Sequence, residues 1–194
     1  MNKAFLEKHS LPVFDADIPI IGIAGRARVG KDTFMESVRG EPKCARLAAA
    51  LKAFFSDATG SPISDDKEAL ARGFPCTTRE WLENVGQYIC RWDPLFWVRL
   101  WALDLYLPID TYGSTCVLFV PDVRKPIEAE VIKAYGGVIV RVNRDSVDLA
   151  DDPHPSTQEI DNIQADWTID NNGTIEHFQN RSALLIQNIV DQWQ

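Results

Sequence analysis

The sequence predicts an α/β protein in which about five parallel strands form a central sheet covered by helices on both faces, giving three layers. Two short apolar runs, at residues 18–25 and 115–124, have the composition and length of buried strands. Each run is followed by a segment with a helix-forming pattern, and further strand and helix patterns alternate along the chain. This alternation is typical of a parallel sheet with helices on both sides.

The first strand leads through a glycine-bearing loop into a helix expected at residues 32–40. An aspartate favours the start of this helix and a glycine favours its end. A brief strand is expected at residues 45–48, running into a helix that ends before Gly60. The N-terminal part therefore contributes two strands and two helices.

The middle of the chain is expected to be helical. A short helix is predicted near residues 66–71 within a segment punctuated by Pro, Asp and Gly. Residues 77–92 open with Thr followed three residues later by Glu80, which is the spacing of a capping box. Residues 93–107 open with Asp followed by Pro94, a residue favoured in the first helical turn. We therefore expect two consecutive helices after the short one.

The C-terminal part returns to strand and helix patterns, and residues 143–160 between them are polar, acidic and Pro-punctuated. We expect these residues to form an exposed loop that moves like a lid. The other elements expected here are a strand at 115–124, a helix at 126–137, a strand at 138–142, a strand within 165–173 and a helix at 174–193.

The composition narrows the class of protein. The chain has 194 residues, about the size of one domain, with a formal net charge of -8 and a pI near 4.9. Direct nucleic-acid binding is not expected, because that affinity comes from a basic face. No apolar run is long enough to span a bilayer, and the four cysteines have no zinc-ligand spacing. We expect a cytoplasmic protein without a membrane anchor.

The loop after the first strand has the pattern of a phosphate-binding loop. Gly25, Gly30 and Lys31 give the sequence Gly-x4-Gly-Lys between a strand and a helix. Backbone N–H groups, the positive end of the helix dipole and a lysine together attract phosphate. An ordinary strand-to-helix turn with two glycines and a lysine is the alternative interpretation.

The loop departs from the usual pattern because Asp32 stands where Ser or Thr is ordinarily found, and Thr33 is the first hydroxyl. Asp32 could hold Mg²⁺ through water, since magnesium prefers hard oxygen ligands. It could equally cap its helix. Both alternatives stay open from the sequence.

A second candidate site lies at the end of the strand at residues 115–124, where Asp122 and Arg124 follow the apolar run. Ligands of open α/β sheets bind beyond the carboxyl ends of the strands. Asp122 suits a magnesium shell or a substrate hydroxyl, and Arg124 suits a bidentate grip on a phosphate. The alternative is a surface Asp-Arg pair.

Several segments, in the same order, resemble the bacteriophage deoxynucleoside monophosphate kinase family of the P-loop nucleotide kinase superfamily. The resemblance spans about residues 20–175, and residues 1–17 have no counterpart in it. Ile127 and Thr157 depart from the family's pattern. The matching segments are Gly-Lys-Asp-Thr at 30–33, LAAALK at 47–52, VGQYICRWDPLFW at 85–97, PDVRKPIEAEVIKAYGGVIVRVNR at 121–144, and His154 with Ser156.

The resemblance implies phosphoryl transfer from ATP to the 5'-phosphate of a deoxynucleoside monophosphate, with Mg²⁺ as the cofactor. The residues implied in catalysis are Lys31, Arg91, Arg124 and Arg144, the last as a lid arginine. Those implied in binding ATP phosphates are Gly25, Arg28, Gly30, Lys31, Asp32 and Thr33. Those implied in binding the acceptor are Lys52, Arg79, Gln87, Arg91, Trp92, Trp97, Asp122 and Arg124. Those implied in holding magnesium are Asp32, Thr33 and Asp122.

The resemblance also implies that residues 1–194 form a single domain whose parts have different roles. Two alternatives stay open, namely a kinase for another small phosphorylated metabolite, such as phosphomevalonate, and a non-catalytic ATP-binding regulator. The apolar segment at residues 99–107 makes a homodimer a candidate assembly. The expected parts are 18–48 for ATP phosphates, 49–107 for the helical monophosphate-binding region, 115–142 for core strands, 143–160 for the lid-like loop, and 165–194 for the C-terminal strand and helix.

Overall fold

The computed structural model describes residues 1–14, 18–38, 42–64, 66–106, 116–147 and 159–193. Its centre is a five-stranded sheet in the order β2-β3-β1-β4-β5, in which every pairing is parallel. The predicted α/β class and the parallel sheet are confirmed. The strands are β1 (Ile20–Ala24), β2 (Lys43–Cys44), β3 (Leu118–Val123), β4 (Val138–Asn143) and β5 (Trp167–Asp170).

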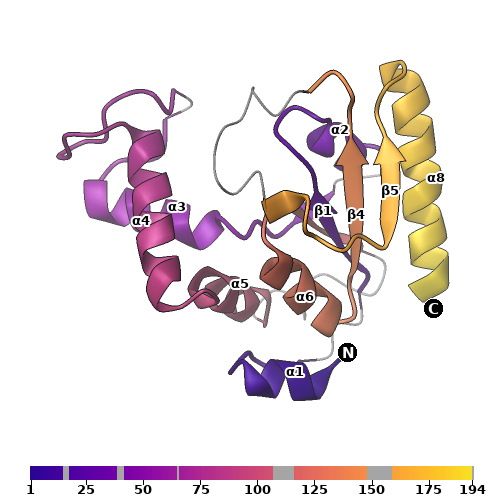
Figure 1. The fold of residues 1–194 in the computed structure, drawn as a ribbon, viewed down its shortest axis with the longest axis horizontal. Helices are drawn as coiled ribbons and strands as arrows, with labels where there is room; N and C mark the ends of the chain where they lie inside the picture. Colours follow the sequence, from indigo (N-terminus) through magenta and orange to yellow (C-terminus); the bar gives the residue numbers. More distant parts are fainter. Residues whose placement is uncertain (15–17, 39–41, 65, 107–115, 148–158, 194) are drawn as a thin grey trace.

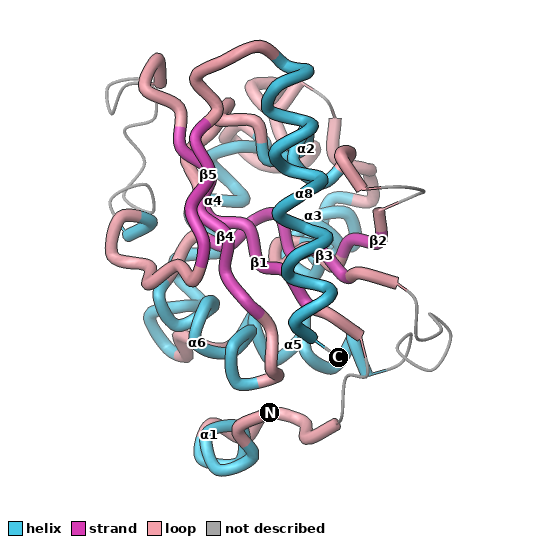
Figure 2. The backbone as a smooth tube through the Cα atoms, turned by 90° about the vertical axis from the view of Figure 1, so that its right-hand side faces the viewer, coloured by secondary structure: helices cyan, strands magenta, loops and turns pink. Residues whose placement is uncertain are grey.

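Helices lie on both sides of this sheet (Figures 1 and 2). Because successive side chains of a strand point to opposite faces, the side chains of β1 pack into two separate hydrophobic cores, one on each face of the sheet. Ile20 packs in one core with Trp101 and Ile132, and Ile21 packs in the other with Phe178. The helices are α1 (Lys3–Lys8), α2 (Lys31–Met35), α3 (Ala49–Thr59), α4 (Thr78–Trp92), α5 (Phe96–Tyr106), α6 (Pro126–Ala134) and α8 (Ile175–Trp193).

Helices α3 and α4 stand to one side of the sheet and have a small core of their own (Figure 1). Phe55 and Trp81 meet edge to face there, with their ring centroids 5.1 Å apart. The predicted capping box of α4 is present, since Thr77 accepts the backbone N–H of Glu80 at 3.1 Å and Glu80 accepts that of Thr77 at 2.7 Å. Helices α3 and α4 face the carboxyl end of β3.

The predicted strand at residues 45–48 is wrong in its position, because β2 covers only Lys43–Cys44. The N–H of Ala45 still bonds to Phe119 O at 2.9 Å. The next donors, the N–H groups of Leu47 and Ala48, each bond to the Asp122 carboxylate at 2.9 Å. The backbone hydrogen bonds between β2 and β3 therefore end after Ala45, because the N–H groups of Leu47 and Ala48 bond to the side chain of Asp122.

The short helix predicted near residues 66–71 is also wrong. The N–H of Ala71 bonds to Cys76 O at 2.8 Å and that of Thr78 bonds to Ala69 O at 2.9 Å. Leu70 and Thr77 thus form an antiparallel bridge, with a turn between them that includes Gly73 at φ 82°. These backbone groups pair across the turn, so they are not used in a helix.

The other helices differ from prediction only in length. Helix α2 ends at Met35, because the N–H groups of Ser37 and Val38 bond three residues back, as in a 3₁₀ turn. Helix α6 ends at Ala134, before Gly136 at φ 91°. The apolar residues of α5 that suggested a homodimer include Trp101 and Leu105, and these lie in the chain's own core.

The N-terminal segment forms a helix that the sequence interpretation did not include. Asn2 caps α1 by accepting the N–H of Phe5 at 3.2 Å, and Leu6 is fully buried. None of the helices in the described ranges combines the length and the apolar character needed to cross a membrane.

Candidate active site

The loop between β1 and α2, residues 25–31, has the backbone shape expected of a phosphate loop. Gly25 has φ 155° and a Cβ there would lie 2.6 Å from Val142 O, so only glycine fits. Gly30 has φ 104° and is the N-cap of α2. Asn171 holds the loop from β5 by donating to Val29 O at 2.8 Å. We call this segment the phosphate loop.

Lys31 lies folded over the phosphate loop. Its Nζ donates to Gly25 O at 2.8 Å and to Arg26 O at 2.7 Å. The ammonium group therefore stands beside the backbone that would surround a phosphate, at the N-terminus of α2. The predicted strand, loop and helix arrangement around Lys31 is present in the structure.

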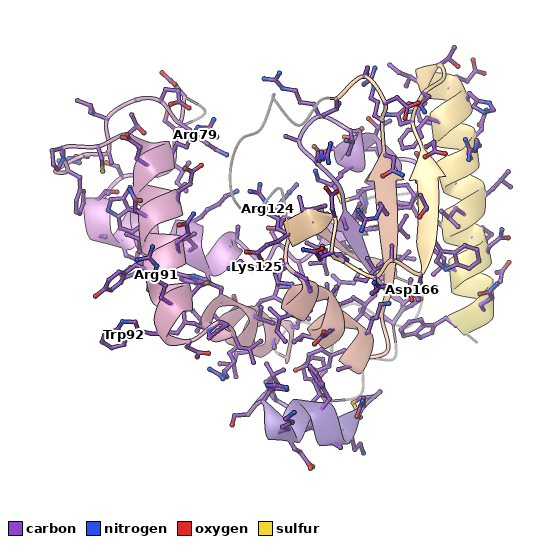
Figure 3. The ribbon with its side chains drawn as sticks, viewed as in Figure 1. Arg79, Arg91, Trp92, Arg124, Lys125 and Asp166 are labelled. Atoms are coloured by element: carbon purple, nitrogen blue, oxygen red, sulfur yellow. The ribbon has the colours of Figure 1, made fainter. Side chains whose placement is uncertain are left out.

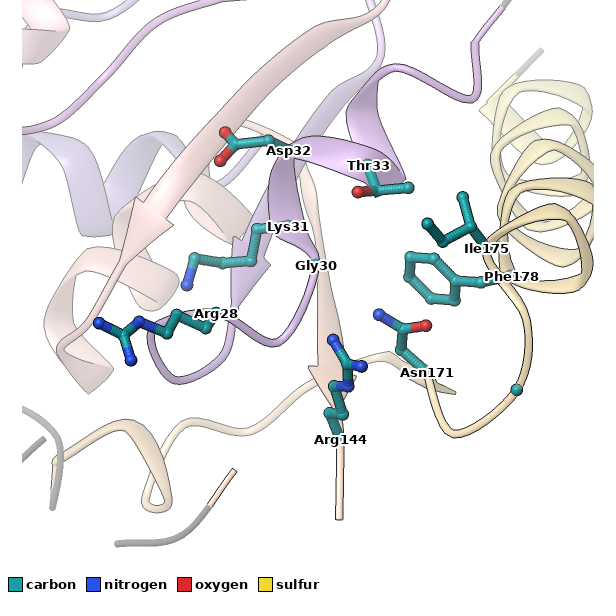
Figure 4. Close-up of a pocket in the computed structure, with 10 residues that line it drawn as sticks. Arg28, Gly30, Lys31, Asp32, Thr33, Arg144, Asn171, Ile175 and Phe178 are labelled. Atoms are coloured by element: carbon teal, nitrogen blue, oxygen red, sulfur yellow. The ribbon is translucent and has the colours of Figure 1, made fainter. Parts of the chain in front are cut away.

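A cavity of about 280 Å³ opens beside this loop, and we call it the phosphate-loop pocket (Figure 4). It brings together five of the predicted residues from the loop and α2, and Arg144 from the end of β4. Residues of the turn after β5 and of α8 complete its wall. Its lining consists of Arg28, Gly30, Lys31, Asp32, Thr33, Arg144, Asn171, Gly173, Ile175 and Phe178.

Asp32 lies in the first turn of α2 but does not cap it, because the N-cap is Gly30 and no side chain caps the helix. The capping alternative is therefore wrong. The Asp32 side chain is 75% exposed, and its carboxylate lies 3.7 Å from Arg46 Nη2. Asp32 and Thr33 thus present hard oxygen atoms at the pocket beside Lys31, a donor set that fits magnesium bound to ATP phosphates. No group of three or more His, Cys, Asp or Glu that could hold a metal on its own occurs among the described residues.

A second cavity, of about 380 Å³, lies between α3, α4, the start of α5 and the end of β3. We call it the α3–α4 pocket. It brings together six predicted residues that are far apart in sequence, namely Lys52, Arg79, Gln87, Trp97, Asp122 and Arg124. Arg79 and Arg124 reach it from elements on opposite sides, α4 and the β3 end (Figure 3).

Arg91 and Trp92 do not line the α3–α4 pocket, in contrast to their predicted role. At about 100° per residue, Glu83 and Gln87 lie on one face of α4 and Trp92 lies on the opposite one. Trp92 is 82% exposed and points outward at the edge of the molecule (Figure 3). The sequence motif that contains these two residues therefore contributes Gln87 and Trp97 to the pocket, but not Arg91 or Trp92.

Asp122 differs from the prediction in how its carboxylate is used. Its two oxygens accept the N–H groups of Leu47 and Ala48, one each, at 2.9 Å. Asp122 therefore holds the residues that lead into α3, and so places Lys52 one turn further on. Both oxygens already accept hydrogen bonds, so Asp122 is a weaker candidate for magnesium than Asp32.

A family model described as deoxynucleotide monophosphate kinase matches residues 76–182, which is more than half of the chain. The chain belongs to the deoxynucleotide monophosphate kinase family. The resemblance stated from the sequence is confirmed, and the enzyme is a nucleotide kinase.

A curated relative agrees with this assignment, and two solved structures share the fold. A protein of Acanthamoeba polyphaga mimivirus, provisionally named a deoxynucleotide monophosphate kinase, is 31% identical over 196 residues, covering 87% of this chain and 96% of the relative. Dephospho-CoA kinase from Campylobacter jejuni is 15% identical and has a TM-score of 0.52, and the match covers 90% of this chain and 98% of the dephospho-CoA kinase chain. The protein TT1252 from Thermus thermophilus is 17% identical, covers 88% and 97%, and has a TM-score of 0.51. The two solved structures share the fold of the kinase.

The α3–α4 pocket of the kinase is strongly basic, although the whole chain is acidic. Burial lowers the pKa of Lys67, and the nearby cations Lys52, Arg79 and Arg124 lower it further. A lysine whose charge is disfavoured by its neighbours indicates an excess of positive potential. The pocket is thus suited to an anion with more than one charge.

Glu128 lies in the same pocket, and the ionised form of its carboxyl group is also disfavoured. Burial raises the pKa of Glu128 to about 7, although the backbone N–H groups of Arg124 and Lys125 donate to its Oε2 at 2.7 and 3.0 Å. Protonation of Glu128 would leave the pocket still more positive. Its hydrogen bonds also fix the backbone that carries Arg124.

Five charged residues of the α3–α4 pocket escaped the sequence interpretation, namely Arg46, Lys67, Glu83, Lys125 and Glu128. Lys125 directly follows Arg124, the last residue of the Asp-Val-Arg motif, and Glu128 lies four residues after it. This closeness in sequence could have identified both residues as candidates. Arg46 and Lys67 lie in no motif, and only the tertiary structure brings them here.

Proposed function

We propose that the kinase transfers the γ-phosphoryl group of ATP to the 5'-phosphate of a deoxynucleoside monophosphate, forming ADP and a deoxynucleoside diphosphate. One observation carries this proposal, namely that the phosphate-loop pocket adjoins the basic α3–α4 pocket. The two meet where Asp32 lies 3.7 Å from Arg46. Two adjoining phosphate-binding pockets suit the transfer of a phosphoryl group from one phosphate to another.

In this proposal the phosphate loop binds ATP. Lys31 and the N–H groups of the loop would hold the β- and γ-phosphates, with Arg28 at the rim of the same pocket. Asp32 and Thr33 would hold Mg²⁺, in part through water. The bound ion would neutralise charge on the phosphate oxygens. Arg144, near the start of the lid-like loop at 143–160, would close over the donor. Residues 148–158 of this loop, with His154 and Ser156 among them, lie outside the described ranges.

The α3–α4 pocket would bind the acceptor. Arg124 suits a bidentate grip on its 5'-phosphate, with Lys52 and Arg79 nearby. Trp97 donates its indole N–H to Gly86 O at 3.2 Å, which fixes the ring as a wall for the nucleoside. Gln87 lies on the same face of α4 as a polar contact for the base. The attacking phosphate oxygen is already anionic, so the reaction rests on alignment and charge neutralisation and needs no general base.

The proposal assigns the expected parts of the single 1–194 domain accordingly, with 18–48 for the donor, 49–107 for the acceptor, 115–142 for the core, 143–160 for the lid and 165–194 for the closing strand and helix. ATP and a deoxynucleoside monophosphate are its only required partners. Such an enzyme would supply nucleotides for DNA synthesis in the cytoplasm, that of the host cell for a bacteriophage protein. Pairing of two chains through residues 99–107 stays a prediction with reduced support, because the core already covers Trp101 and Leu105.

The test is a coupled assay of ADP release with ATP, Mg²⁺ and each of the four deoxynucleoside monophosphates, their ribonucleotide counterparts and phosphomevalonate. We expect ADP and a matching deoxynucleoside diphosphate, identified by chromatography, and loss of both in the Lys31→Ala variant. Bound ATP without acceptor-dependent ADP would identify a regulator instead. ADP release with phosphomevalonate alone would identify a metabolite kinase.

A further inference from the structure

Arg46 lies at the junction of the two pockets. It lines the α3–α4 pocket, and its Nη2 lies 3.7 Å from the Oδ1 of Asp32. Asp32 follows Lys31 directly and lines the phosphate-loop pocket. The guanidinium group therefore reaches from the pocket proposed for the acceptor to the edge of the pocket proposed for ATP. A phosphoryl group passing between them would travel close to it.

The backbone around Arg46 is held from several sides. Ala45 donates its N–H to Phe119 O at 2.9 Å, and its O accepts the indole N–H of Trp101 at 3.0 Å. On the other side, the N–H of Leu47 bonds to the Asp122 carboxylate at 2.9 Å. Arg46 thus has a fixed base at the end of β2, which reduces the entropy lost when its side chain binds a ligand.

Within the described ranges, the head group of Arg46 forms a weak ion pair with Asp32. Its side chain is 45% exposed, Asp32 is 75% exposed, and their separation of 3.7 Å is long for a hydrogen bond. Exposed ion pairs of this kind contribute little to stability. The guanidinium can therefore leave Asp32 when a more highly charged oxygen group arrives, and Asp32 is then available to magnesium.

We propose that Arg46 is a catalytic residue that donates hydrogen bonds to the phosphoryl group while it moves from ATP to the acceptor. In this step the bond between the γ-phosphorus and the β,γ-bridging oxygen breaks, and a bond forms between that phosphorus and an oxygen of the acceptor phosphate. ADP leaves with the bridging oxygen's electron pair. Arg46 stays protonated throughout and stabilises the charge on the transferred oxygens. This assignment rests on the proposed function.

The first test compares the steady-state kinetics of Arg46→Ala and Arg46→Lys with a matched control, Arg72→Ala, whose arginine lines neither pocket and lies 3.4 Å from Ser61 Oγ. We expect Arg46→Ala to lower kcat on the order of 100- to 1,000-fold, the cost of removing one donor to a transition-state oxygen. KM for both substrates should change little, Lys should restore part of kcat, and added guanidinium at a non-denaturing concentration should raise the turnover of Arg46→Ala. Unchanged kcat in Arg46→Ala would overturn the assignment.

The second test measures binding and does not depend on turnover. Its ligands are ATP alone, each deoxynucleoside monophosphate alone, and analogues in which adenosine and a deoxynucleoside are joined through five phosphates. By titration calorimetry, Arg46→Ala should bind ATP and the monophosphates almost as wild type does, but the joined analogue about 10- to 100-fold more weakly.

The outcomes separate the two proposals. Wild type that binds ATP but none of the joined analogues would overturn the proposed function, and the role of Arg46 with it. Equal losses of affinity for the joined analogue and for ATP alone would overturn only the role of Arg46, because they would show that Arg46 supports the phosphate loop.

Discussion

The Oε2 atom of Glu128 accepts a hydrogen bond from the backbone N–H of Arg124 at a distance of 2.7 Å. This contact ties the first turn of α6 to Arg124, the residue proposed to grip the acceptor phosphate. It does so with a carboxyl group whose pKa is raised to about 7 by burial. The protonation state of Glu128 therefore changes close to neutral pH, at the edge of the α3–α4 pocket.

The first prediction concerns the pH dependence of stability and uses Glu128→Gln, which keeps an acceptor oxygen but does not ionise. The folded-state pKa of about 7 exceeds the unfolded value of about 4.3. The stabilising contribution of the protonated carboxyl is therefore fully present below about pH 4.3 and is lost as the pH rises through 7. Between pH 5 and 8, the free energy of unfolding of wild type should fall relative to that of Glu128→Gln by about 1–3 kcal/mol.

Urea denaturation followed by circular dichroism at several pH values checks this. Glu130→Gln is the control, because Glu130 is an exposed residue of the same helix. A constant offset between Glu128→Gln and wild type across this range would show that Glu128 is ionised throughout.

The second prediction concerns Asp122 and the start of α3. In Asp122→Asn, an NH₂ group would face one of the two N–H donors that the carboxylate now accepts. We expect a loss of about 1.5–3 kcal/mol in the free energy of unfolding, the range for a hydrogen bond to a charged group. We also expect a higher KM for the acceptor, because Lys52 lies on the helix that is released. Asp57→Asn, at an exposed position of α3, should change neither quantity.

The third prediction separates two arginines that the sequence placed in the same role. Arg124 lines the α3–α4 pocket and Arg91 does not. Arg124→Ala should lower kcat/KM for the acceptor by about 100-fold or more, since it removes a bidentate charged contact. Arg91→Ala should stay within about threefold of wild type. Acceptor-dependent initial rates decide between them, and a large loss in Arg91→Ala would restore the assignment made from the sequence.

The sequence predicted the parts of the fold that depend on local patterns. The apolar runs that became β1 and β3 were recognisable because parallel strands are buried on both faces. The capping box of α4 was visible in Thr77 and Glu80. The short β2 was misplaced because its end depends on Asp122, more than 70 residues further along the chain. The helix predicted near 66–71 failed because the segment pairs with residues 76–78.

The candidate site likewise has one part that local sequence patterns predict and one part that depends on the tertiary structure. The phosphate loop is contiguous, so glycine spacing and Lys31 were enough to predict it. The α3–α4 pocket is assembled from residues of α3, α4, α5, β3 and α6 and of the segments between them, and a motif does not show which face of a helix its residues lie on. For that reason Trp92 was predicted beside Trp97 although only Trp97 lines the pocket, and Arg46 and Lys67 were missed.

The N-terminal segment, which lies outside the recognisable motifs, contacts elements next to the α3–α4 pocket. Tyr135 donates its hydroxyl to Pro12 O at 2.7 Å and stacks on Phe14, with ring centroids 4.6 Å apart. Arg99 of α5 donates to His9 O at 3.2 Å. The segment therefore links α6 to α5, the helix whose first turns carry Trp97.

The fourth prediction tests this link through Tyr135→Phe, which removes the hydroxyl and leaves Pro12 O without that donor. We expect the free energy of unfolding to fall by about 1 kcal/mol, the typical net value of one hydrogen bond. Turnover at saturating substrates should stay unchanged, because Tyr135 lines neither pocket. Urea denaturation and initial rates measure the two effects, and Tyr88→Phe is the control, since Tyr88 is 60% exposed. A loss of turnover equal in size to the loss of stability would mean that the N-terminal segment acts on the active site itself. Stability unchanged in Tyr135→Phe would mean that packing on Phe14, and not the hydroxyl, holds the segment in place.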